Sequence, residues 1–414
     1  MKFCIDGQHR LRGELPVYGA KNCVLALLGA TVLTDEDVVL RNCPNISDVQ
    51  NMLLVLQGLG KKFCWESGDT LRVFGSVCNT TVNQSLANKL RGSALVLGSL
   101  VGKCHNAVLP CPGGCSIGQR PLNIHVDGLQ TFGVEVTSQE HLHCNGTPQG
   151  AMFHLPIASV GATENLVCAS VLGKGQFVLS NCATEPEVEN LQQMLVAMGA
   201  KIGGVGTSTV VVEGVQKLHG VTWQVIPDRI VCATYIASAI ASKGQLTVTN
   251  CNPTHLRSFL QVLPCPIAVK VYQNAIQVAC NHYPSSFGKV TTAPYPGFPT
   301  DMQSLLLALA CLSNGGTTQI TEKMFENRLM HNASQLCKMG AQISVVGQTA
   351  TVVGGQLHGA TVGCGDLRGG ASLVVAGLGA QGQTVVTNTH HVLRGYSQLA
   401  EALQSVGARI EVQN

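Results

Sequence analysis

The stretch GATENLVCASVLGKGQFVLSNCATEPEVENLQQMLVAMGAKI, residues 161–202, decides the fold because it holds one complete structural repeat. It opens with small and apolar residues that favour a buried helix, and a glycine-containing turn and a strand pattern follow. After a loop, the apolar spacing of VENLQQMLVAMGA, residues 188–200, predicts a second helix, for which Gly199 supplies the C-terminal cap. A closing strand completes the unit.

Six segments of the chain share this order of helix, turn, strand, loop, helix and strand. They begin at Gly19, Arg91, Gly161, Asp228, Thr300 and Asp366. Their period of roughly 70 residues is longer than that of ordinary solenoid repeats. Strands are also predicted for TVVVEGV, residues 209–215, and QLTVTN, residues 245–250. Six such units predict an α/β fold with two domains of three repeats, divided near Pro227, and the cleft between domains is the expected ligand site.

The composition excludes several classes of protein. The chain has 414 residues, which favours two domains, and only 12% of them are charged. Because the formal net charge is only +3, a general nucleic-acid binder or membrane-surface binder is disfavoured. Any basic site must therefore be a local cluster.

The 18 cysteines do not indicate a disulfide framework or a zinc site. They are scattered singly, and the sequence contains no C-x-x-C pair. Most are expected to be small core residues in a reducing compartment. The N-terminus MKFCIDGQHR lacks the apolar segment of a signal peptide, and SLLLALACL, residues 304–312, is too short to span a bilayer. We therefore expect a soluble, cytoplasmic protein.

The stretch VLPCPGGCSIGQRP, residues 108–121, predicts an exposed loop. Its glycines weaken any helix or strand, and its prolines favour extended neighbours. Cys115 thus lies on the loop with little steric cover. Since a nearby cation favours the thiolate, Arg120 should make Cys115 unusually reactive.

The repeats and nine short motifs together resemble the enolpyruvyl transferases, in the branch that acts on a nucleotide sugar. The resemblance covers nearly the whole chain, and the motifs occur in the order found in that family. They are GAKN (19–22), LRGS (90–93), PGGCSIGQRP (112–121), SVGATEN (159–165), PDRI (227–230), FPTDMQ (298–303), FENRLMH (325–331), DLRGGASL (366–373) and RGY (394–396).

The resemblance implies a two-domain inside-out α/β barrel built from six βαβαββ-like repeats, three per domain. Residues 21–227 would form the domain that carries the Cys115 loop. Residues 1–20 and 228–414 would form the second domain, into which the N-terminal strand crosses.

The implied reaction transfers enolpyruvate from phosphoenolpyruvate to the 3′-hydroxyl of UDP-N-acetylglucosamine and releases phosphate. It is the first committed step of peptidoglycan synthesis. It needs no metal or organic cofactor, and no nucleic acid or membrane partner is expected.

The resemblance also assigns roles to residues. Cys115 matches the proton donor, which can carry a covalent phosphoenolpyruvate adduct and is the target of fosfomycin. Asp301 matches the residue that contacts the 3′-hydroxyl and acts as base, although an Asp at this place could also be a helix N-cap with Met302 as the first helical residue. Lys21 and Arg394 complete the catalytic set.

The remaining matches concern binding. A small anion such as phosphoenolpyruvate needs several cations, and guanidinium forks suit its carboxylate and phosphate. Its matched residues are Lys21, Asn22, Arg120, Arg328, Arg368 and Arg394. Those matched to UDP-N-acetylglucosamine are Asn22, Arg91, Arg120, Pro121, Leu122, Asn123, Ile124, Ile157, Ser159, Val160, Asp301 and Met324.

Five positions depart from the family pattern, and each departure removes a charge. Ile157 stands where Lys is frequent and Asn123 where Asp is usual; the other three are Thr184 for Arg, Leu393 for Asp and Val231 for Glu. None alters the proton donor, the base or the anion-binding basic residues. The departures therefore bear on nucleotide binding more than on the reaction.

Two other functions share much of this pattern. The sister transferase of the shikimate pathway has the same fold and donor but another acceptor, and the Cys115 loop and SVGAT favour the nucleotide sugar. A non-catalytic paralogue that binds a nucleotide sugar would lack a catalytic residue, and none is missing here.

Overall fold

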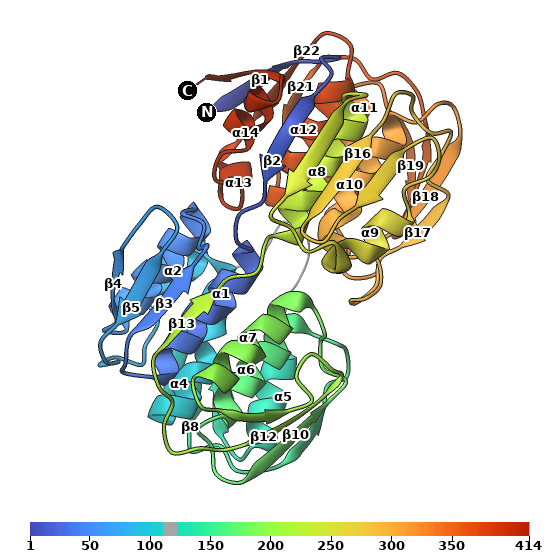
Figure 1. Cartoon of the computed structure of the whole chain (residues 1–414). Helices are drawn as coiled ribbons and strands as arrows, with labels where there is room; N and C mark the ends of the chain where they lie inside the picture. The colour runs from blue at the N-terminus through green and yellow to red at the C-terminus, as the bar shows by residue number, and fades with distance from the viewer. Residues whose placement is uncertain (111–121, 139, 414) are drawn as a thin grey trace. The chain divides into compact units, whose positions relative to one another are not determined.

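Each repeat begins with a helix that is apolar around most of its circumference, a composition that favours a position inside the fold. The computed structural model describes residues 1–110, 122–138 and 140–413 (Figure 1). The inner helices are α1 (Lys21–Ala30), α4 (Val96–Cys104) after the 3-10 turn η2 (Arg91–Leu95), α6 (Val160–Ser170), α8 (Arg229–Ala241), α10 (Thr300–Cys311) and α12 (Leu367–Gly379).

The described residues divide into two compact units. The N-terminal unit comprises residues 19–110 and 122–226, and the C-terminal unit comprises Met1–Tyr18 and residues 227–413. Each unit has its own hydrophobic core. In the C-terminal unit α8, α10 and α12 pack on one another, and in the N-terminal unit α4 packs against α6 and α1 against α7.

Three sheets surround the inner helices of the C-terminal unit, in the orders β15-β16-β14-β2, β17-β18-β20-β19 and β21-β22-β1-β23. The strand β1 occupies the position in the last sheet that β20 occupies in the preceding one, so the N-terminal segment completes the final repeat (Figure 1). The strands are β1 (Lys2–Asp6), β2 (Arg12–Pro16), β14 (Gln245–Thr249), β15 (Ala268–Val271), β16 (Ala275–Ala279), β17 (Lys289–Thr291), β18 (Thr317–Thr321), β19 (Gln342–Val346), β20 (Thr349–Val353), β21 (Thr361–Gly363), β22 (Gln383–Thr387) and β23 (Arg409–Gln413).

The N-terminal unit repeats this plan with the described sheets β13-β3-β5-β4, β11-β12-β10-β9 and β6-β8-β7. In two of them a parallel strand from a neighbouring repeat pairs with the first strand, as β13 pairs with β3. The strands are β3 (Val38–Arg41), β4 (Lys62–Trp65), β5 (Leu71–Phe74), β6 (Asn106–Pro110), β7 (Glu135–Ser138), β8 (His141–Asn145), β9 (Met152–His154), β10 (Gln176–Ser180), β11 (Lys201–Gly203), β12 (Thr209–Glu213) and β13 (Val221–Gln224). The predicted α/β class with three repeats in each half is confirmed.

In most repeats the second helix is more amphipathic or shorter than the first. These helices are α2 (Ser47–Gly58), α5 (Asn123–Thr131), α7 (Pro186–Ala197), α9 (Arg257–Gln261) after η3 (Pro253–Leu256), α11 (Arg328–Lys338) and α14 (Leu399–Ser405); η1 (Thr31–Leu33), α3 (Gln84–Lys89) and α13 (His390–Leu393) are short connecting elements. The helix predicted over residues 188–200 is α7, which starts two residues earlier because Pro186 occupies its first turn. It ends at Ala197, with Met198 as its cap, and Gly199 follows at a φ of 102°.

An asparagine in a left-handed conformation ends the first strand of several repeats. Asn42, Asn181 and Asn250 have φ values of 58°, 57° and 50°, which asparagine tolerates better than most residues. Their side-chain amides donate to the backbone carbonyls of Val225, Leu155 and Val17, respectively, on the segment beside that strand. The strand predicted over residues 245–250 therefore ends one residue earlier.

The cysteines behave mostly as core residues. Of the 16 cysteines in the described ranges, 11 are buried, and burial raises the pKa of Cys43 and Cys168 to about 12. The described helices include none with the length and apolar character needed to cross a membrane.

Candidate active site

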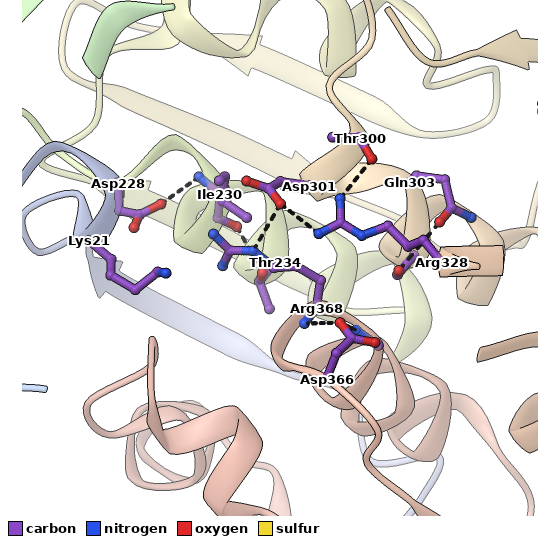
Figure 2. A network of polar contacts seen from close by, with 12 residues as sticks. Lys21, Asp228, Ile230, Thr234, Thr300, Asp301, Gln303, Arg328, Asp366 and Arg368 are labelled. Carbon is purple, nitrogen blue, oxygen red and sulfur yellow. Dashed lines mark hydrogen bonds and ion pairs between the residues drawn. The ribbon is translucent and has the colours of Figure 1, made fainter. Parts of the chain in front are cut away.

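The site in the C-terminal unit is built at the start of α10. Thr300 and Asp301 are the first two residues of that helix, and Pro299 is its N-cap. The interpretation of Asp301 as an N-cap is therefore wrong. Its carboxylate points instead toward two arginines from other helices and forms ion pairs with them (Figure 2).

Two guanidinium groups converge on this carboxylate. Oδ1 of Asp301 lies 3.0 Å from Nη2 of Arg328 and 3.6 Å from Nε of Arg368 (Figure 2). Arg328 is the first residue of α11 and Arg368 the second of α12, so the first turns of three helices bring these charges together. The C-terminal unit thus contains Asp301, Arg328 and Arg368 in one cluster.

Two of the three charged side chains in this cluster are positive, and both of these are buried. The side chains of Arg328 and Arg368 are each 4% exposed, whereas Asp301 is 24% exposed. Within the described residues, Nε of Arg328 and Nη1 of Arg368 are buried without a hydrogen-bond partner. Such donors favour an anionic ligand, because a buried, unsatisfied N–H is costly.

The position of Arg368 is fixed from both ends. The N-cap Asp366 accepts hydrogen bonds from the backbone N–H groups of Arg368 and Gly369, at 2.9 and 3.0 Å. The guanidinium lies 5.9 Å from the centre of the Tyr396 ring. Burial alone would lower the pKa of Arg368, but the nearby Asp301 carboxylate, with Tyr396 and Asp228, raises it above its ordinary value.

Tyr396 itself is held by the inner helix α8. Its hydroxyl is hydrogen bonded to that of Thr234 at 2.8 Å, and both side chains are buried. The preceding Gly395 carbonyl accepts from the hydroxyl of Tyr18 at 3.3 Å. These contacts fix the RGY segment at the end of α13, where Arg394 is half-buried.

In the N-terminal unit, α1 begins with Lys21 and Asn22. Nζ of Lys21 lies 3.3 Å from Oδ2 of Asp48, whose side chain is only 2% exposed. Because Asp48 lies in the first turn of α2, this pair ties the GAKN motif to the second helix of its repeat. Asp48 lies outside every motif, so no signal in the sequence points to it.

Several of the residues matched to the nucleotide sugar lie at two helix starts, those of α5 and α6. Leu122, Asn123 and Ile124 open α5, and Ser159 caps α6, accepting from the Ala162 N–H at 3.4 Å. Val160 is the first residue of α6, and Arg91 opens the 3-10 turn before α4. The helices α5 and α6 pack together.

His125 lies at the contact between α5 and α6. Burial lowers its pKa to about 4, the charge of Arg91 acts in the same direction, and a hydrogen bond with the backbone of Gly161 opposes them. The imidazole is therefore neutral at physiological pH. A lone histidine on a helix has no distinctive spacing, so the sequence does not single out His125.

The five departures from the family pattern lie in different surroundings. Val231 is fully buried in the core of the C-terminal unit, and Leu393 packs against that core. Ile157 is 57% exposed and Asn123 is exposed, while Thr184 is half-buried. Two of the lost charges are thus replaced by apolar packing.

Three predicted residues, Cys115, Arg120 and Pro121, lie outside the described residues. Met324 is half-buried between β18 and α11, and its backbone N–H donates to Glu322. Across residues 1–110, 122–138 and 140–413, no group of three or more His, Cys, Asp or Glu side chains is arranged to hold a metal ion.

The chain is similar over nearly its whole length to known proteins. The sequence profile of a family described as EPSP synthase (3-phosphoshikimate 1-carboxyvinyltransferase) matches residues 5–403. UDP-N-acetylglucosamine 1-carboxyvinyltransferase 2 of Caldanaerobacter subterraneus is 41% identical over 413 residues, which cover 99% of each chain. The UDP-N-acetylglucosamine 1-carboxyvinyltransferase of Ruegeria pomeroyi is 41% identical over 414 residues, 98% of each chain.

A solved structure supports the fold. The enolpyruvyl transferase NikO from Streptomyces tendae superimposes with a TM-score of 0.89 at 24% identity, over 99% of this chain and 98% of NikO. At this identity the likeness establishes the architecture alone.

Proposed function

Because this chain belongs to the enolpyruvyl transferase family, we propose that the cluster of Asp301, Arg328 and Arg368 is where its donor and acceptor substrates meet. The chain is an enzyme that transfers the enolpyruvyl group of phosphoenolpyruvate to the 3′-hydroxyl of UDP-N-acetylglucosamine and releases phosphate. This reaction serves peptidoglycan synthesis. The full-length relatives with that activity in their names support this acceptor over the shikimate intermediate.

One observation carries the binding proposal. Two guanidinium groups, each 4% exposed, share a single carboxylate and keep buried N–H donors without partners among the described residues. The carboxylate of phosphoenolpyruvate would satisfy these donors. We assign Arg328 and Arg368 to that carboxylate, and Lys21, Arg120 and Arg394 to the phosphate. Asn22 is assigned to both substrates.

The nucleotide sugar is assigned to a second set of residues on the basis of the motifs, and several of them lie at helix starts. Backbone N–H groups at a helix start favour the diphosphate, and Arg91 and Arg120 would add charge. The set further comprises Pro121, Leu122, Asn123, Ile124, Ile157, Ser159, Val160 and Met324.

The chemistry requires one acid and one base. Asp301 accepts the proton of the sugar 3′-hydroxyl as the 3′-oxygen bonds to C2 of phosphoenolpyruvate. At the same time Cys115 delivers a proton to C3. Loss of a proton from C3 then restores the double bond as phosphate leaves. Lys21, Arg120 and Arg394 would stabilise the charge that develops on the departing phosphate.

Acceptor-dependent phosphate release tests this function. Purified protein and phosphoenolpyruvate should release phosphate continuously with UDP-N-acetylglucosamine and remain at background without it. Shikimate 3-phosphate in place of the nucleotide sugar distinguishes the sister activity, and we expect no turnover with it. Release with shikimate 3-phosphate alone, or with neither acceptor, would show that the assignment is wrong.

A further inference from the structure

A buried carboxylate lies behind the cluster that we assign to the substrates. Glu322 follows β18 and is 1% exposed. Its Oε1 accepts hydrogen bonds from the Thr292 hydroxyl at 3.0 Å and from the backbone N–H groups of Met324 and Phe325 at 2.7 and 3.2 Å. Its Oε2 accepts from the Thr300 hydroxyl at 2.8 Å. A carboxylate with four donors is well satisfied and rigidly held.

One of these donors connects Glu322 to Arg328. The Thr300 hydroxyl has a single proton, which it donates to Glu322. The hydroxyl oxygen therefore accepts a hydrogen bond from Nη1 of Arg328 at 2.7 Å, and Figure 2 shows this contact between Thr300 and Arg328. The other terminal nitrogen of Arg328, Nη2, donates to Asp301 at 3.0 Å. Glu322 thus fixes the direction in which the Thr300 hydroxyl points. Through that hydroxyl it also fixes the orientation of the Arg328 guanidinium plane.

A second connection runs through Phe325. The bond from its backbone N–H to Glu322 fixes the turn that leads into α11, and the guanidinium of Arg328 lies 5.0 Å from the centre of the Phe325 ring. Glu322 therefore contacts Arg328 indirectly in two ways. Thr300 accepts a hydrogen bond at the edge of the guanidinium group, and the Phe325 ring lies against its face.

We propose that Glu322 is a positioning residue for the transfer reaction: through Thr300 and Phe325 it orients Arg328 toward Asp301 and the carboxylate of phosphoenolpyruvate. This inference rests on the proposed function for the identity of the ligand. A buried acid that only stabilised the fold would affect unfolding, but it would not change the affinity for one substrate in preference to the other.

Two threonines that donate to the same carboxylate provide a matched pair. Thr300→Val removes the hydroxyl between Glu322 and Arg328. Thr292→Val removes the hydroxyl on Oε1 and also the acceptor of the Lys323 N–H, at 2.8 Å, but leaves the hydrogen bonds of Arg328 in place. Both replacements keep the side-chain shape, and the control loses at least as many hydrogen bonds as the test variant.

The experiment measures the KM of both substrates and thermal unfolding for the two variants. We expect Thr300→Val to raise the KM for phosphoenolpyruvate about tenfold or more, and Thr292→Val to keep it within about twofold of wild type, with little change for UDP-N-acetylglucosamine in either. Glu322→Gln should resemble Thr300→Val, because an amide nitrogen opposite Thr300 would remove the acceptor of its proton. Equal KM changes in the two threonine variants, or no change in Thr300→Val, would refute the positioning role.

A binding measurement separates this inference from the proposed function. Stabilisation against heat by phosphoenolpyruvate alone should be weaker in Thr300→Val than in Thr292→Val, whatever the acceptor. If the wild type binds phosphoenolpyruvate but releases no phosphate with UDP-N-acetylglucosamine, the proposed acceptor is wrong. The heat stabilisation of the two variants by phosphoenolpyruvate would still decide the positioning role. Equal stabilisation in both variants would overturn the positioning role.

Discussion

At the scale of single residues, two carboxylates hold the arginines of the candidate site in place. Asp301 serves Arg328 and Arg368 together, and Glu322 stands behind them with four hydrogen-bond donors. The role of Asp301 as a residue of interest followed from the FPTDMQ motif, but its contacts did not. A sequence gives the residue type, whereas the direction of a carboxylate depends on which helices meet around it.

Replacing Asp301 with Asn tests this cluster. The amide keeps the shape but cannot accept the sugar proton, so turnover should fall by roughly two orders of magnitude or more. Two buried guanidiniums also lose a shared counter-charge, and since Asp301 is 24% exposed we expect a stability loss of about 1–3 kcal/mol. Kinetics and denaturant unfolding provide both measurements. Wild-type turnover in the folded variant would remove Asp301 from the mechanism.

The buried His125 predicts a pH dependence of stability. Its pKa is lowered to about 4 in the folded state, against an ordinary value of 6.5. Between these values the unfolded chain binds the proton and the folded chain does not, so stability falls as the pH drops from about 6.5 to 4. The loss should approach about 3 kcal/mol, because each unit of pKa shift corresponds to about 1.4 kcal/mol.

Comparing variants across that window isolates the effect. His125→Gln has no proton to gain, so its stability relative to wild type should improve as the pH falls. His143→Gln, at an exposed position on β8, is the control and should follow wild type. Parallel pH profiles for all three proteins would show that His125 is not kept neutral by folding.

At the scale of elements, glycines set how closely the inner helices approach. A Cβ at Gly98 in α4 would lie 1.9 Å from the carbonyl oxygen of Asn165 in α6, and one at Gly102 would lie 2.8 Å from that of Cys168. Asn165 also accepts from the Gly98 N–H at 2.7 Å and donates to the Gly161 carbonyl at 3.0 Å. The Asn of the SVGATEN motif therefore holds two inner helices together in addition to any contact with substrate.

Gly98→Ala should consequently separate α4 from α6. We expect a loss of about 2–4 kcal/mol, at or above the usual range for overpacking, because the obstacle is backbone and not a flexible side chain. The control is Gly58→Ala at the end of α2, where a Cβ would meet nothing within 4 Å, and it should be neutral or slightly stabilising. Denaturant midpoints of the two variants decide this, and equal midpoints would contradict the close packing.

The sequence predicted the elements well and their ends less well. Apolar runs located α8, α10 and α12, because a helix buried on all sides must be apolar on all sides. The strand ends at Asn181 and Asn250 were not predicted, since a left-handed asparagine looks like any polar residue until its amide meets the neighbouring strand. Glu322 and Asp48 were missed because they lie outside every motif and because their side-chain partners are distant in sequence.

At the scale of the whole molecule, the repeat explains why the site residues are spread along the chain. Three of the residues that we assign to the substrates lie in the first turn of an inner helix: Lys21 on α1, Asp301 on α10 and Arg368 on α12. A helix start favours anions, which suits two phosphorylated substrates. The N-terminal strand β1, paired between β22 and β23, joins the first residues of the chain to its last repeat.

The product of the reaction tests the central claim most directly. UDP-N-acetylglucosamine incubated with phosphoenolpyruvate and the protein should be analysed by mass spectrometry for its gain of one enolpyruvyl group, and by two-dimensional NMR for the position of the new ether. We expect stoichiometric phosphate and an enol ether at the 3′-oxygen of the sugar. Phosphate release with an unmodified nucleotide sugar, or an ether at any other oxygen, would contradict the account.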